Sequence, residues 1–439
     1  MLPNSPLNRG LVSFSLGFLL VFSLLVFHLR ETCFRDPSSI FFRPEHARVL
    51  SYSAFRRTQA RKHAAQAGVH EPVKWSNATE GVHPELCIAI GSVSRQGFSY
   101  LKETLGSVLE GLDDVERSSV YVVVFLAHTD QTEHEDFGQP WLRNMADSLP
   151  TYPQDAAMLE LVRKLEKEND YPAHARKQKI DYSVLLDECA KVHPEYTMTL
   201  EDDVIALDGW FHRMRAALQT AAQRTRDMGR SSFLYMRIFH DGRLLGWNAE
   251  EAPVYIFYSV ATVIPQLVVL WYLRWRFAAV QKAVPLQLLL LVYGICMPMM
   301  IGLFFAAGRS CMLPKPPGVS LMQQYGCCGQ GLVFPQDQVN RHLLPMYSNS
   351  NDSHAAVDTF LEDWADSRDE LRWAVSPVLI QHVGGKSSHG AGDQRFGQLT
   401  DDMPFDYAFE SNDPVELAKE HQIWSDGLRK ELMKGKIIE

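Results

Sequence analysis

Three apolar stretches constrain this chain more than any other feature of its sequence. They cover residues 11–29, 254–273 and 284–307, and none of them carries a formal charge. As a helix, each is long enough to cross the roughly 30 Å hydrocarbon core of a bilayer. We therefore predict three membrane spans, with the rest of the chain outside the bilayer.

The first stretch has two interpretations, a cleaved signal peptide or a retained signal anchor. Its apolar run is longer than the hydrophobic region of a typical signal peptide. Residues 27–30, with the sequence FHLR, offer no small-x-small cleavage site. We therefore interpret residues 11–29 as a transmembrane signal anchor that follows a cytosolic N-terminus of residues 1–10.

The second and third stretches are separated by residues 274–283, which include Arg274, Arg276 and Lys282. Basic residues beside membrane spans favour the cytosolic side. We therefore predict a transmembrane helical hairpin with a cytosolic turn. The alternative, a buried pair of core helices, is disfavoured by the aromatic residues around Trp271, which are typical of a membrane interface.

This topology places residues 31–253 and 308–439 together in the lumen of the secretory pathway. The glycosylation tripeptides at Asn77 and Asn351 fit that placement, although such tripeptides also occur by chance. Only six residues separate Trp247 from the second span. An extended chain of that length reaches at most roughly 25 Å, so the adjoining domain should stay close to the membrane.

The luminal residues divide into four parts. Residues 30–84 contain a basic run at positions 56–63 with little hydrophobic periodicity, and we interpret them as a luminal stem, a lipid-binding basic patch being the alternative. Residues 85–253 and 308–399 are predicted to be the two parts of one domain. Residues 400–439 are interpreted as a C-terminal luminal tail.

Charge and cysteine content exclude several classes of protein. The chain of 439 residues has 43 basic and 52 acidic side chains, and this net charge of −9 argues against nucleic acid as a partner. Seven scattered cysteines are too few for a disulfide scaffold. Setting aside Cys296 in the third span leaves six, which allow fifteen complete pairings, including a strained bond between Cys327 and Cys328.

Strand-like and helical segments alternate after residue 85. Apolar runs at residues 86–91, 119–127 and 196–200 indicate buried strands, and residues 100–112, 155–168 and 177–192 have helical spacing. This alternation predicts an open α/β sheet whose ligand lies at the carboxyl ends of the strands. A further strand at 233–239 and a second arm at 244–247 are predicted to form a hairpin.

An acidic triplet, Glu201-Asp202-Asp203, directly follows the third of these strands. About one such triplet is expected by composition alone, so its position is the informative feature. Like charges crowded at a strand end repel one another unless a cation neutralises them, and divalent cations prefer oxygen ligands. The triplet therefore indicates either a metal site or a solvated strand end.

Three later motifs carry possible chemistry, and each also has a structural explanation. The glycine-rich residues 326–331 permit close backbone approach to a ligand, or simply form turns. The acidic pair Glu362-Asp363 suits general-base catalysis, or a solvated helix face. His382, at the end of the apolar run that starts at residue 378, is a ligand or a structural histidine.

Taken in order, these motifs resemble the GT-A glycosyltransferase fold, which has a metal-binding D-x-D motif, a glycine-rich acceptor loop, an x-E-D motif and a C-terminal histidine. The resemblance covers residues 85–395. The segment from residue 177 to the acidic triplet is also similar to the branching N-acetylglucosaminyltransferases. The implied fold is an α/β, Rossmann-like GT-A domain interrupted by a transmembrane hairpin, with an N-terminal transmembrane helix.

The three-span layout resembles one family in particular, the Golgi N-acetylgalactosaminyltransferases that modify glycosylphosphatidylinositol (GPI) anchors after attachment to protein. The resemblance implies transfer of N-acetylgalactosamine from UDP-GalNAc to a mannose of the anchor glycan, with Mn²⁺ as the metal. GPI-anchored proteins would be the acceptors. The enzyme would be a multi-pass Golgi membrane protein with a luminal catalytic domain.

The resemblance also implies residue roles. Asp203 is expected to bind the metal with Glu201 and His382, and Glu201 and Asp202 to position the ribose and the outer shell. Asp363 would be the catalytic base of an inverting transfer, with Glu362 in reserve. Contacts to uridine and phosphates are expected from Ser92, Arg95, Lys179 and Asp181. Because the triplet reads Glu-Asp-Asp rather than Asp-x-Asp, the metal-bridging role of its first residue is open.

Two other functions fit the same sequence. The fold could serve an N-acetylglucosaminyltransferase or a galactosyltransferase that acts on protein-linked glycans. It could also belong to a non-catalytic, membrane-anchored glycan-binding factor. A transporter is disfavoured because the three spans lack charged residues to line a path.

Overall fold

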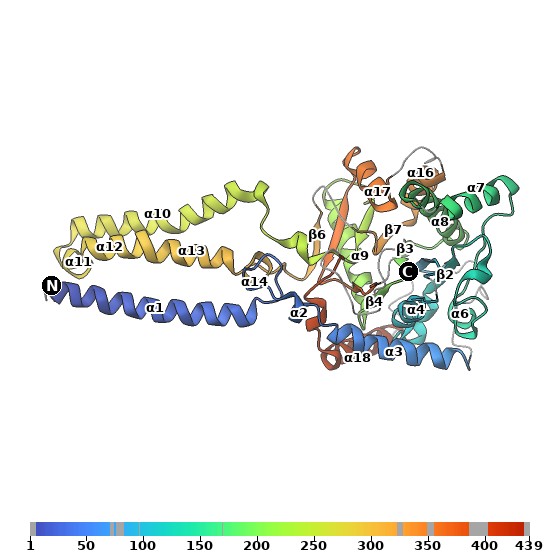
Figure 1. Ribbon diagram of the computed structural model, residues 1–439, viewed down its shortest axis with the longest axis horizontal. Helices are drawn as coiled ribbons and strands as arrows, with labels where there is room; N and C mark the ends of the chain where they lie inside the picture. The colour runs from blue at the N-terminus through green and yellow to red at the C-terminus, as the bar shows by residue number, and fades with distance from the viewer. Residues whose placement is uncertain are drawn as a thin grey trace. The chain divides into compact units, whose positions relative to one another are not determined.

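The computed structural model forms two compact units (Figure 1). It describes residues 6–70, 74–75, 83–95, 97–168, 170–322, 328–348, 355–385 and 403–433. The smaller unit comprises Met1–Arg48 and Gly242–Lys315, and the larger unit comprises Val49–Asp241 and Pro316–Glu439. The predictions made for Asn77, Asn351 and Cys327 fall outside the described residues.

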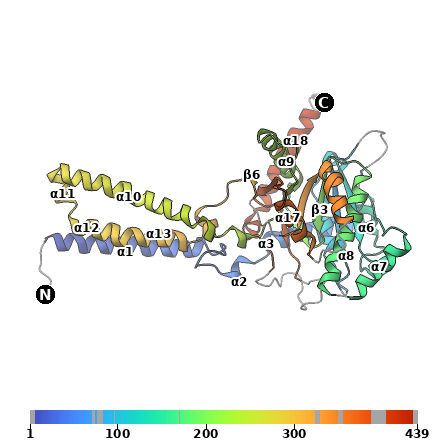
Figure 2. The same cartoon turned by 90° about the horizontal axis from the view of Figure 1, so that it is seen from above.

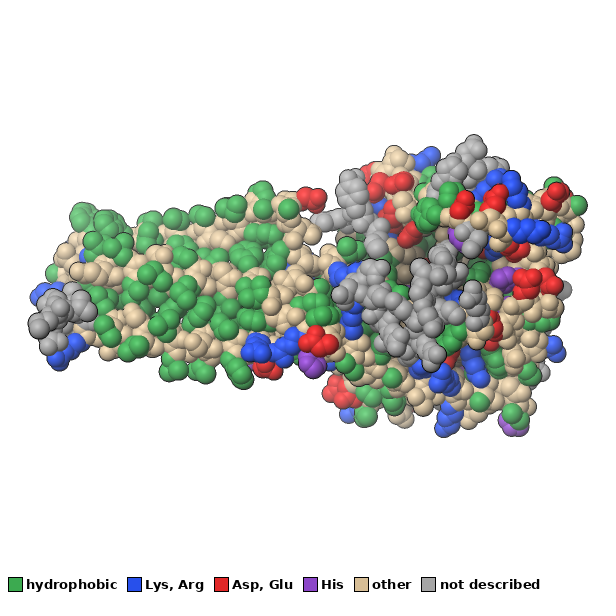
Figure 3. All heavy atoms as spheres, in the orientation of Figure 1, with side chains coloured by type: hydrophobic (Ala, Val, Ile, Leu, Met, Phe, Trp, Pro, Cys, Tyr) green, Lys and Arg blue, Asp and Glu red, His purple; other side chains and the backbone are tan. Residues whose placement is uncertain are grey.

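The smaller unit consists mainly of long apolar helices. They are α1 (Pro6–Thr32), α10 (Ala252–Arg276), and α12 (Leu286–Leu291), which continues through the π-helical turn η4 (Val292–Cys296) into α13 (Met297–Ala306). Within this unit, α1 and α13 run side by side in both views (Figures 1 and 2). Hydrophobic side chains cover these helices (Figure 3). All three predicted spans therefore correspond to helices long and apolar enough to cross a membrane.

Short segments connect these helices. Residues 278–283 form α11 (Ala278–Ala283) between α10 and α12. After α1 and α13 come the short helices α2 (Pro44–Ala47) and α14 (Arg309–Met312). The orientation of the unit in a bilayer, with a cytosolic turn, stays a prediction.

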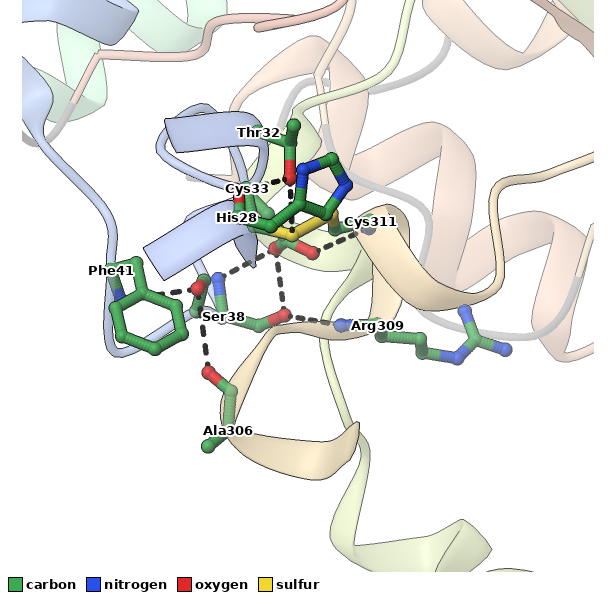
Figure 4. Close-up of a disulfide and its surroundings, with 10 residues drawn as sticks. His28, Thr32, Cys33, Ser38, Phe41, Ala306, Arg309 and Cys311 are labelled. Carbon is green, nitrogen blue, oxygen red and sulfur yellow. Dashed lines mark hydrogen bonds between the residues drawn. A yellow bond between two sulfur atoms is a disulfide. The ribbon is translucent and has the colours of Figure 1, made fainter. Parts of the chain in front are cut away.

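A disulfide between Cys33 and Cys311 joins the end of α1 to the segment after α13 (Figure 4). Hydrogen bonds surround it. Ser38 Oγ accepts from the Arg309 backbone N–H at 2.9 Å, and the Ile40 backbone N–H donates to the Ala306 carbonyl at 2.9 Å. The apolar helices α1 and α13 are thus fastened together at one end by covalent and polar contacts.

The predicted hairpin arm at residues 244–247 is wrong. Residues there form the 3₁₀ helix η2 (Gly242–Leu245), followed by η3 (Ala249–Glu251). The strand before them, β5 (Tyr235–Arg237), pairs with β7 on one side and β8 on the other. Because both edges of β5 are occupied, no edge is left for a hairpin partner.

The larger unit contains a seven-stranded mixed sheet with the order β2-β1-β3-β7-β5-β8-β6. Its other strands are β1 (Leu86–Ser92), β2 (Val120–Leu126), β3 (Tyr196–Glu201), β6 (Gly318–Leu321), β7 (Gly331–Pro335) and β8 (Arg372–Ser376). Strands β7 and β6 run antiparallel to their neighbours, and the remaining pairs are parallel. A second, two-stranded sheet pairs β4 (Val204–Ala206) with β9 (Ile380–His382). The predicted α/β class is confirmed.

Helices cover both faces of the large sheet. Along β1, Leu86, Ile88 and Ile90 face one hydrophobic core, while Cys87 and Ala89 face another, as the period of two in a strand requires. The first core includes α4 (Leu101–Leu109), α6 (Pro140–Met145) and α9 (Trp210–Asp227). The second includes α7 (Ala156–Glu168) and α8 (Tyr171–Ala190), and a disulfide between Cys87 and Cys189 fastens α8 to β1.

A third hydrophobic cluster lies around β7 and β5. It is formed with α8, the π-helical turn η5 (Val339–Leu343), α16 (Leu344–Ser348) and α17 (Val357–Asp366). The larger unit also has the short helices α5 (Asp114–Ser118), η1 (Gln131–Glu133), α15 (Gln336–Gln338) and η6 (Phe409–Ser411), and the C-terminal helix α18 (Pro414–Met433).

The stem predicted over residues 30–84 differs from the structure at its most basic segment. Residues 51–67 form α3 (Ser51–Ala67), which packs on α4 in the larger unit. Gly106 on α4 allows the close approach, because a Cβ added there would lie 2.6 Å from the Ala60 carbonyl oxygen of α3. Arg56 is fully buried, donating to the carbonyls of Ala206 and Ser107 at 3.0 and 2.9 Å.

The C-terminal residues also belong to the folded unit. Phe405, Tyr407 and Phe409 are buried, and Phe409 packs against Tyr52 of α3 with ring centroids 5.3 Å apart. The region predicted to be a luminal tail from residue 400 onward is therefore integrated into the domain core over its first described part.

Candidate functional site

The pairing of β4 with β9 brings two distant parts of the chain together. Val204 lies opposite His382 in this antiparallel pair, and the Val383 backbone N–H donates to the Asp203 carbonyl at 2.9 Å. Asp203 directly precedes β4, so its side chain lies beside the end of β9. Asp203 and His382 are 179 positions apart in the sequence, and the register of β4 with β9 makes them neighbours in the fold.

Asp203 and His382 form a buried acid–imidazole pair. The Asp203 Oδ2 atom lies 3.5 Å from His382 Nε2. His382 Nδ1 faces the Pro404 carbonyl at 3.1 Å, and because a carbonyl only accepts, Nδ1 carries the proton. Burial opposes charge on both groups, but their mutual attraction lowers the pKa of Asp203 and raises the pKa of His382.

Glu201 is the third carboxylate at this position. Its Oε2 atom accepts a hydrogen bond from Gln330 Nε2 at 3.1 Å. Burial and the negative charge of Asp203 raise the pKa of Glu201. A cation between the two carboxylates would remove the repulsion that favours the protonated form.

Asp202 points into a different environment from its two neighbours. Its oxygens accept two hydrogen bonds from the Arg95 guanidinium, both 2.6 Å long, and a third from the Ser92 hydroxyl. Ser92 also contacts His134 Nε2 at 2.9 Å. Arg95 is only 8% exposed and lies 3.6 Å from Asp203 Oδ2. Ser92 and Arg95 therefore hold Asp202, the middle residue of the acidic triplet, in place.

The residues present fit a divalent cation. Ligand atoms of Glu201, Asp203 and His382 all lie within 4.8 Å of one another. Asp203 Oδ1 is buried without a hydrogen-bond partner among the described residues. A Cβ added at Gly384 would lie 2.2 Å from Asp203 Oδ2, so only glycine leaves this space open. Carboxylate and imidazole ligands of this kind suit Mn²⁺ and related ions.

Lys179 and Asp181 lie on α8, and both side chains are buried. Asp181 accepts from Lys177 Nζ at 2.9 Å and from the Tyr152 hydroxyl at 2.5 Å. Lys179 is buried, with Nζ 4.9 Å from the centroid of the Phe360 ring. Neither residue is among the potential metal ligands Glu201, Asp203 and His382.

The acidic pair on α17 is split between two environments. Glu362 is 5% exposed, and its oxygens accept from Arg237 and Arg372, both at 2.7 Å, and from the Tyr235 hydroxyl. Asp363, the next residue of the helix, is exposed. Of the two residues, only Asp363 has a carboxylate that is accessible to a substrate.

Asp358, in the first turn of α17, is a carboxylate that sequence reasoning did not single out. A Cβ built at Gly329 would lie 3.7 Å from both Asp358 Cβ and Glu201 Oε1, so these residues meet across the described end of the glycine-rich loop. The negative charge of Asp358 contributes to the raised pKa of Glu201. The sequence does show that Asp358 lies one helical turn before Glu362. Nothing in the sequence shows that this turn of the helix faces Glu201.

One curated relative of the chain is a glycosyltransferase. The chain is 28% identical over 147 residues to the alpha-1,3-mannosyl-glycoprotein 4-beta-N-acetylglucosaminyltransferase B of Danio rerio. The matched stretch covers 30% of this chain and 25% of that protein. The chain thus spans about a quarter of the length of this relative, which is itself a glycosyltransferase.

A family profile covers the domain that carries the site. It is described as GPI-N-acetylgalactosamine transferase PGAP4, and it matches residues 86–381. That range includes the acidic triplet, the described end of the glycine-rich loop, the α17 carboxylates and β9 up to Gln381. The chain therefore belongs to the GPI-N-acetylgalactosamine transferase PGAP4 family of glycosyltransferases.

Proposed function

We propose that the protein transfers N-acetylgalactosamine from UDP-GalNAc to a mannose of the GPI-anchor glycan on GPI-anchored proteins. The observation that carries the proposal is the cluster of Glu201, Asp203 and His382, in which Asp203 Oδ1 is buried without a described partner. An acidic cluster of this kind, at the carboxyl end of β3, suits a cation and a nucleotide diphosphate. The family supplies the sugar and the acceptor class.

Glu201, Asp203 and His382 would hold the cation, with Mn²⁺ the expected ion. When bound, a divalent cation supplies positive charge that stabilises the departing diphosphate. The residues of the chain prepare the position for it. The Pro404 carbonyl fixes the Nδ1–H tautomer of His382, which leaves Nε2 facing Asp203. Arg95 binds Asp202 and so holds the acidic triplet in its orientation.

The transfer itself needs one base if it inverts the anomeric centre. The base takes the proton of the acceptor hydroxyl as its oxygen bonds to the sugar C1 and the bond from C1 to the diphosphate breaks. We assign this role to Asp363, whose carboxylate is exposed, while Glu362 is held by Arg237 and Arg372. Asp358 is the rival candidate, because it lies beside Glu201.

The GT-A fold, the Golgi location and the luminal orientation belong to the same proposal. The mixed sheet, with its acidic site at the end of β3, supports a nucleotide-sugar fold. The three apolar helices support a multi-pass membrane protein. A catalytic domain tied by a short connection to its own hairpin would present its site to a glycan whose root is in the bilayer. Such geometry favours GPI-anchored acceptors over freely diffusing glycoproteins.

A second donor sugar is the main alternative. The similarity to an N-acetylglucosaminyltransferase favours UDP-GlcNAc as that alternative. The test is to incubate the detergent-solubilised full chain with Mn²⁺, a GPI glycan and a panel of UDP-sugars, using Asp203→Ala as the matched control. Transfer from UDP-GalNAc alone, absent in the control, supports the proposal. Transfer from UDP-GlcNAc instead would overturn the donor assignment, and glycan binding without consumption of any donor would overturn the enzymatic role.

A further inference from the structure

A second group of potential metal ligands lies in the larger unit and uses none of the residues of the proposed transferase site. It consists of Glu116 on α5, His212 in the first turn of α9 and His421 on α18, and we call it the His421 cluster. The three residues are 1%, 6% and 7% exposed. One ligand atom from each lies within 4.8 Å of the others.

His421 is oriented by a carboxylate on each side. Its Nδ1 lies 2.9 Å from Asp208 Oδ1, and its Nε2 lies 3.1 Å from Glu116 Oε2. A carboxylate that binds one ring nitrogen and directs the other toward a metal is the usual outer-shell arrangement at zinc sites. The contact with Asp208 therefore aims Nε2 at Glu116, where the second carboxylate lies.

Two polar atoms of the cluster are left without a hydrogen-bond partner. Glu116 Oε1 and His212 Nδ1 are both buried, and neither is bonded to any atom in the described part of the chain. Buried polar atoms are nearly always satisfied, so each such atom calls for a missing partner. A cation bound between them would satisfy a carboxylate oxygen and a neutral imidazole nitrogen at the same time.

His212 is held beside His421 by packing. Its ring stacks on Trp424 of α18 at a centroid distance of 4.9 Å, and lies 5.2 Å from the His421 ring. An imidazole held in this way can bind a metal through a ring nitrogen in its neutral form.

The ligand set and its dimensions suit zinc. Two imidazoles and one carboxylate are typical zinc ligands, and a water molecule completes the tetrahedron. Ligand atoms about 2.0–2.1 Å from a tetrahedral zinc ion lie about 3.3 Å apart, and His421 Nε2 and Glu116 Oε2 are 3.1 Å apart. The two negative charges of Glu116 and Asp208 would be balanced by one divalent cation.

We propose that Glu116, His212 and His421 bind a zinc ion that fastens the C-terminal helix α18 to the domain. The ligands come from three helices that are far apart in the sequence, so the ion would cross-link α5, α9 and α18. Weaker contacts already join the same elements. Arg213 pairs with Glu420 at 2.5 Å, and the Ser425 hydroxyl donates to Asp113 at 2.5 Å.

The competing explanation is a proton in place of the metal. Hydrogen bonds to Asp208 and Glu116 raise the pKa of His421 to about 10, so a protonated His421 could link the two carboxylates. That arrangement uses Glu116, Asp208 and His421, and it does not involve His212. The two explanations therefore predict different behaviour for variants of His212.

The test is to measure zinc in the purified full chain by mass spectrometry, after dialysis against a weak chelator. The measurement is made in Asp203→Ala protein, which lacks one of the three ligands of the proposed transferase cation site. We expect one zinc ion per chain in this background, and its loss in both His212→Gln and His421→Gln. The variant His46→Gln, at an exposed position of the smaller unit, is the control and should keep the zinc.

Thermal unfolding provides a second measurement that does not depend on transferase activity. Returning zinc to the chelated protein should raise the unfolding midpoint by about 5 °C, and should fail to do so in His212→Gln. Absence of zinc from the Asp203→Ala protein, or its retention in His212→Gln, would overturn the proposal. If His421→Gln does not fold, His212→Gln still decides between the ion and the proton, because only the ion requires His212.

Discussion

Asp203 Oδ2 lies 3.5 Å from His382 Nε2, although the apolar helices α10, α12 and α13 lie between the two residues in the sequence. The register between β4 and β9 creates this contact. It joins a carboxylate that follows β3 to an imidazole whose tautomer is fixed by Pro404. The proposed cation site depends on this pair.

Replacing His382 should weaken the cation site without unfolding the domain. In His382→Ala, the proposed metal loses one ligand of three, and we expect the Mn²⁺ concentration needed for half-maximal transfer to rise about 10–100-fold. The measurement is transferase activity against Mn²⁺ concentration. His342→Ala on η5 is the matched control, because this histidine packs against Trp364 and is not a member of the cluster. An unchanged Mn²⁺ requirement in His382→Ala would remove His382 from the site.

Replacing Arg95 should destabilise the protein as well as inactivate it. Arg95→Ala leaves the buried carboxylate of Asp202 without its two 2.6 Å hydrogen bonds, and breaking a buried pair of this kind costs about 3–5 kcal/mol. Arg95→Lys keeps the charge but loses the two-pronged geometry, so it should also be less stable. Chemical denaturation measures the free energy of unfolding.

Lys191→Ala is the comparison for this experiment. Lys191 pairs with Glu188 at 2.7 Å, but its side chain is 61% exposed, so the loss should stay below about 1 kcal/mol. Equal effects of Arg95→Ala and Lys191→Ala on stability would contradict the structural role given to Arg95.

Variants of the two carboxylates Glu362 and Asp363 on α17 should differ in whether they lose activity or stability. Asp363→Asn should lower kcat by about 10²–10⁴-fold with donor binding preserved, because it removes the proposed base. Glu362→Gln should instead lower stability, because Arg237 and Arg372 lose a buried counter-charge. Steady-state kinetics, UDP binding and thermal unfolding of each variant distinguish these effects. Full activity in Asp363→Asn together with an inactive Asp358→Asn would move the base to Asp358.

Asp406 should make the domain more stable under mildly acidic conditions. Burial, followed by the charges of Asp241 and Glu410, raises the pKa of Asp406 from 3.8 to about 6. His240 Nδ1 faces the same carboxylate at 3.5 Å. The folded state therefore binds a proton between pH 6 and 4 that the unfolded state does not, so stability rises as the pH falls through about 6.

The measurement for Asp406 is the free energy of unfolding between pH 7.5 and 4.5. Asp406→Asn keeps one oxygen to accept from the Phe409 backbone N–H, and it removes the titrating group. We expect the variant to be more stable at pH 7.5, by on the order of 1–3 kcal/mol, and to lose this part of the pH dependence. A variant with the pH dependence of the original protein would show that another group titrates there.

The sequence predicts the parts of this structure that depend on local patterns. Hydrophobic length identified the three apolar helices, and the alternation of strands and helices identified the α/β sheet. The strand at residues 196–200 ends at the acidic triplet as expected. These features depend on periodicity and composition, which a single sequence displays directly.

Features that depend on tertiary pairing could not be predicted. The basic run in α3 looks solvated, yet Arg56 is buried because carbonyls of Ala206 and Ser107 accept its hydrogen bonds. The triplet does not show which carboxylate binds Arg95, because that depends on how the chain turns between β3 and β4. The three members of the His421 cluster come from α5, α9 and α18, and no local motif connects them.

Titration of Mn²⁺ into the purified full chain in the presence of UDP, followed by calorimetry, measures the proposed cation site itself. We expect one saturable Mn²⁺ site that is lost in Asp203→Asn and kept in Asp187→Asn, an exposed position on α8. Equal Mn²⁺ binding by the original protein and Asp203→Asn would contradict it.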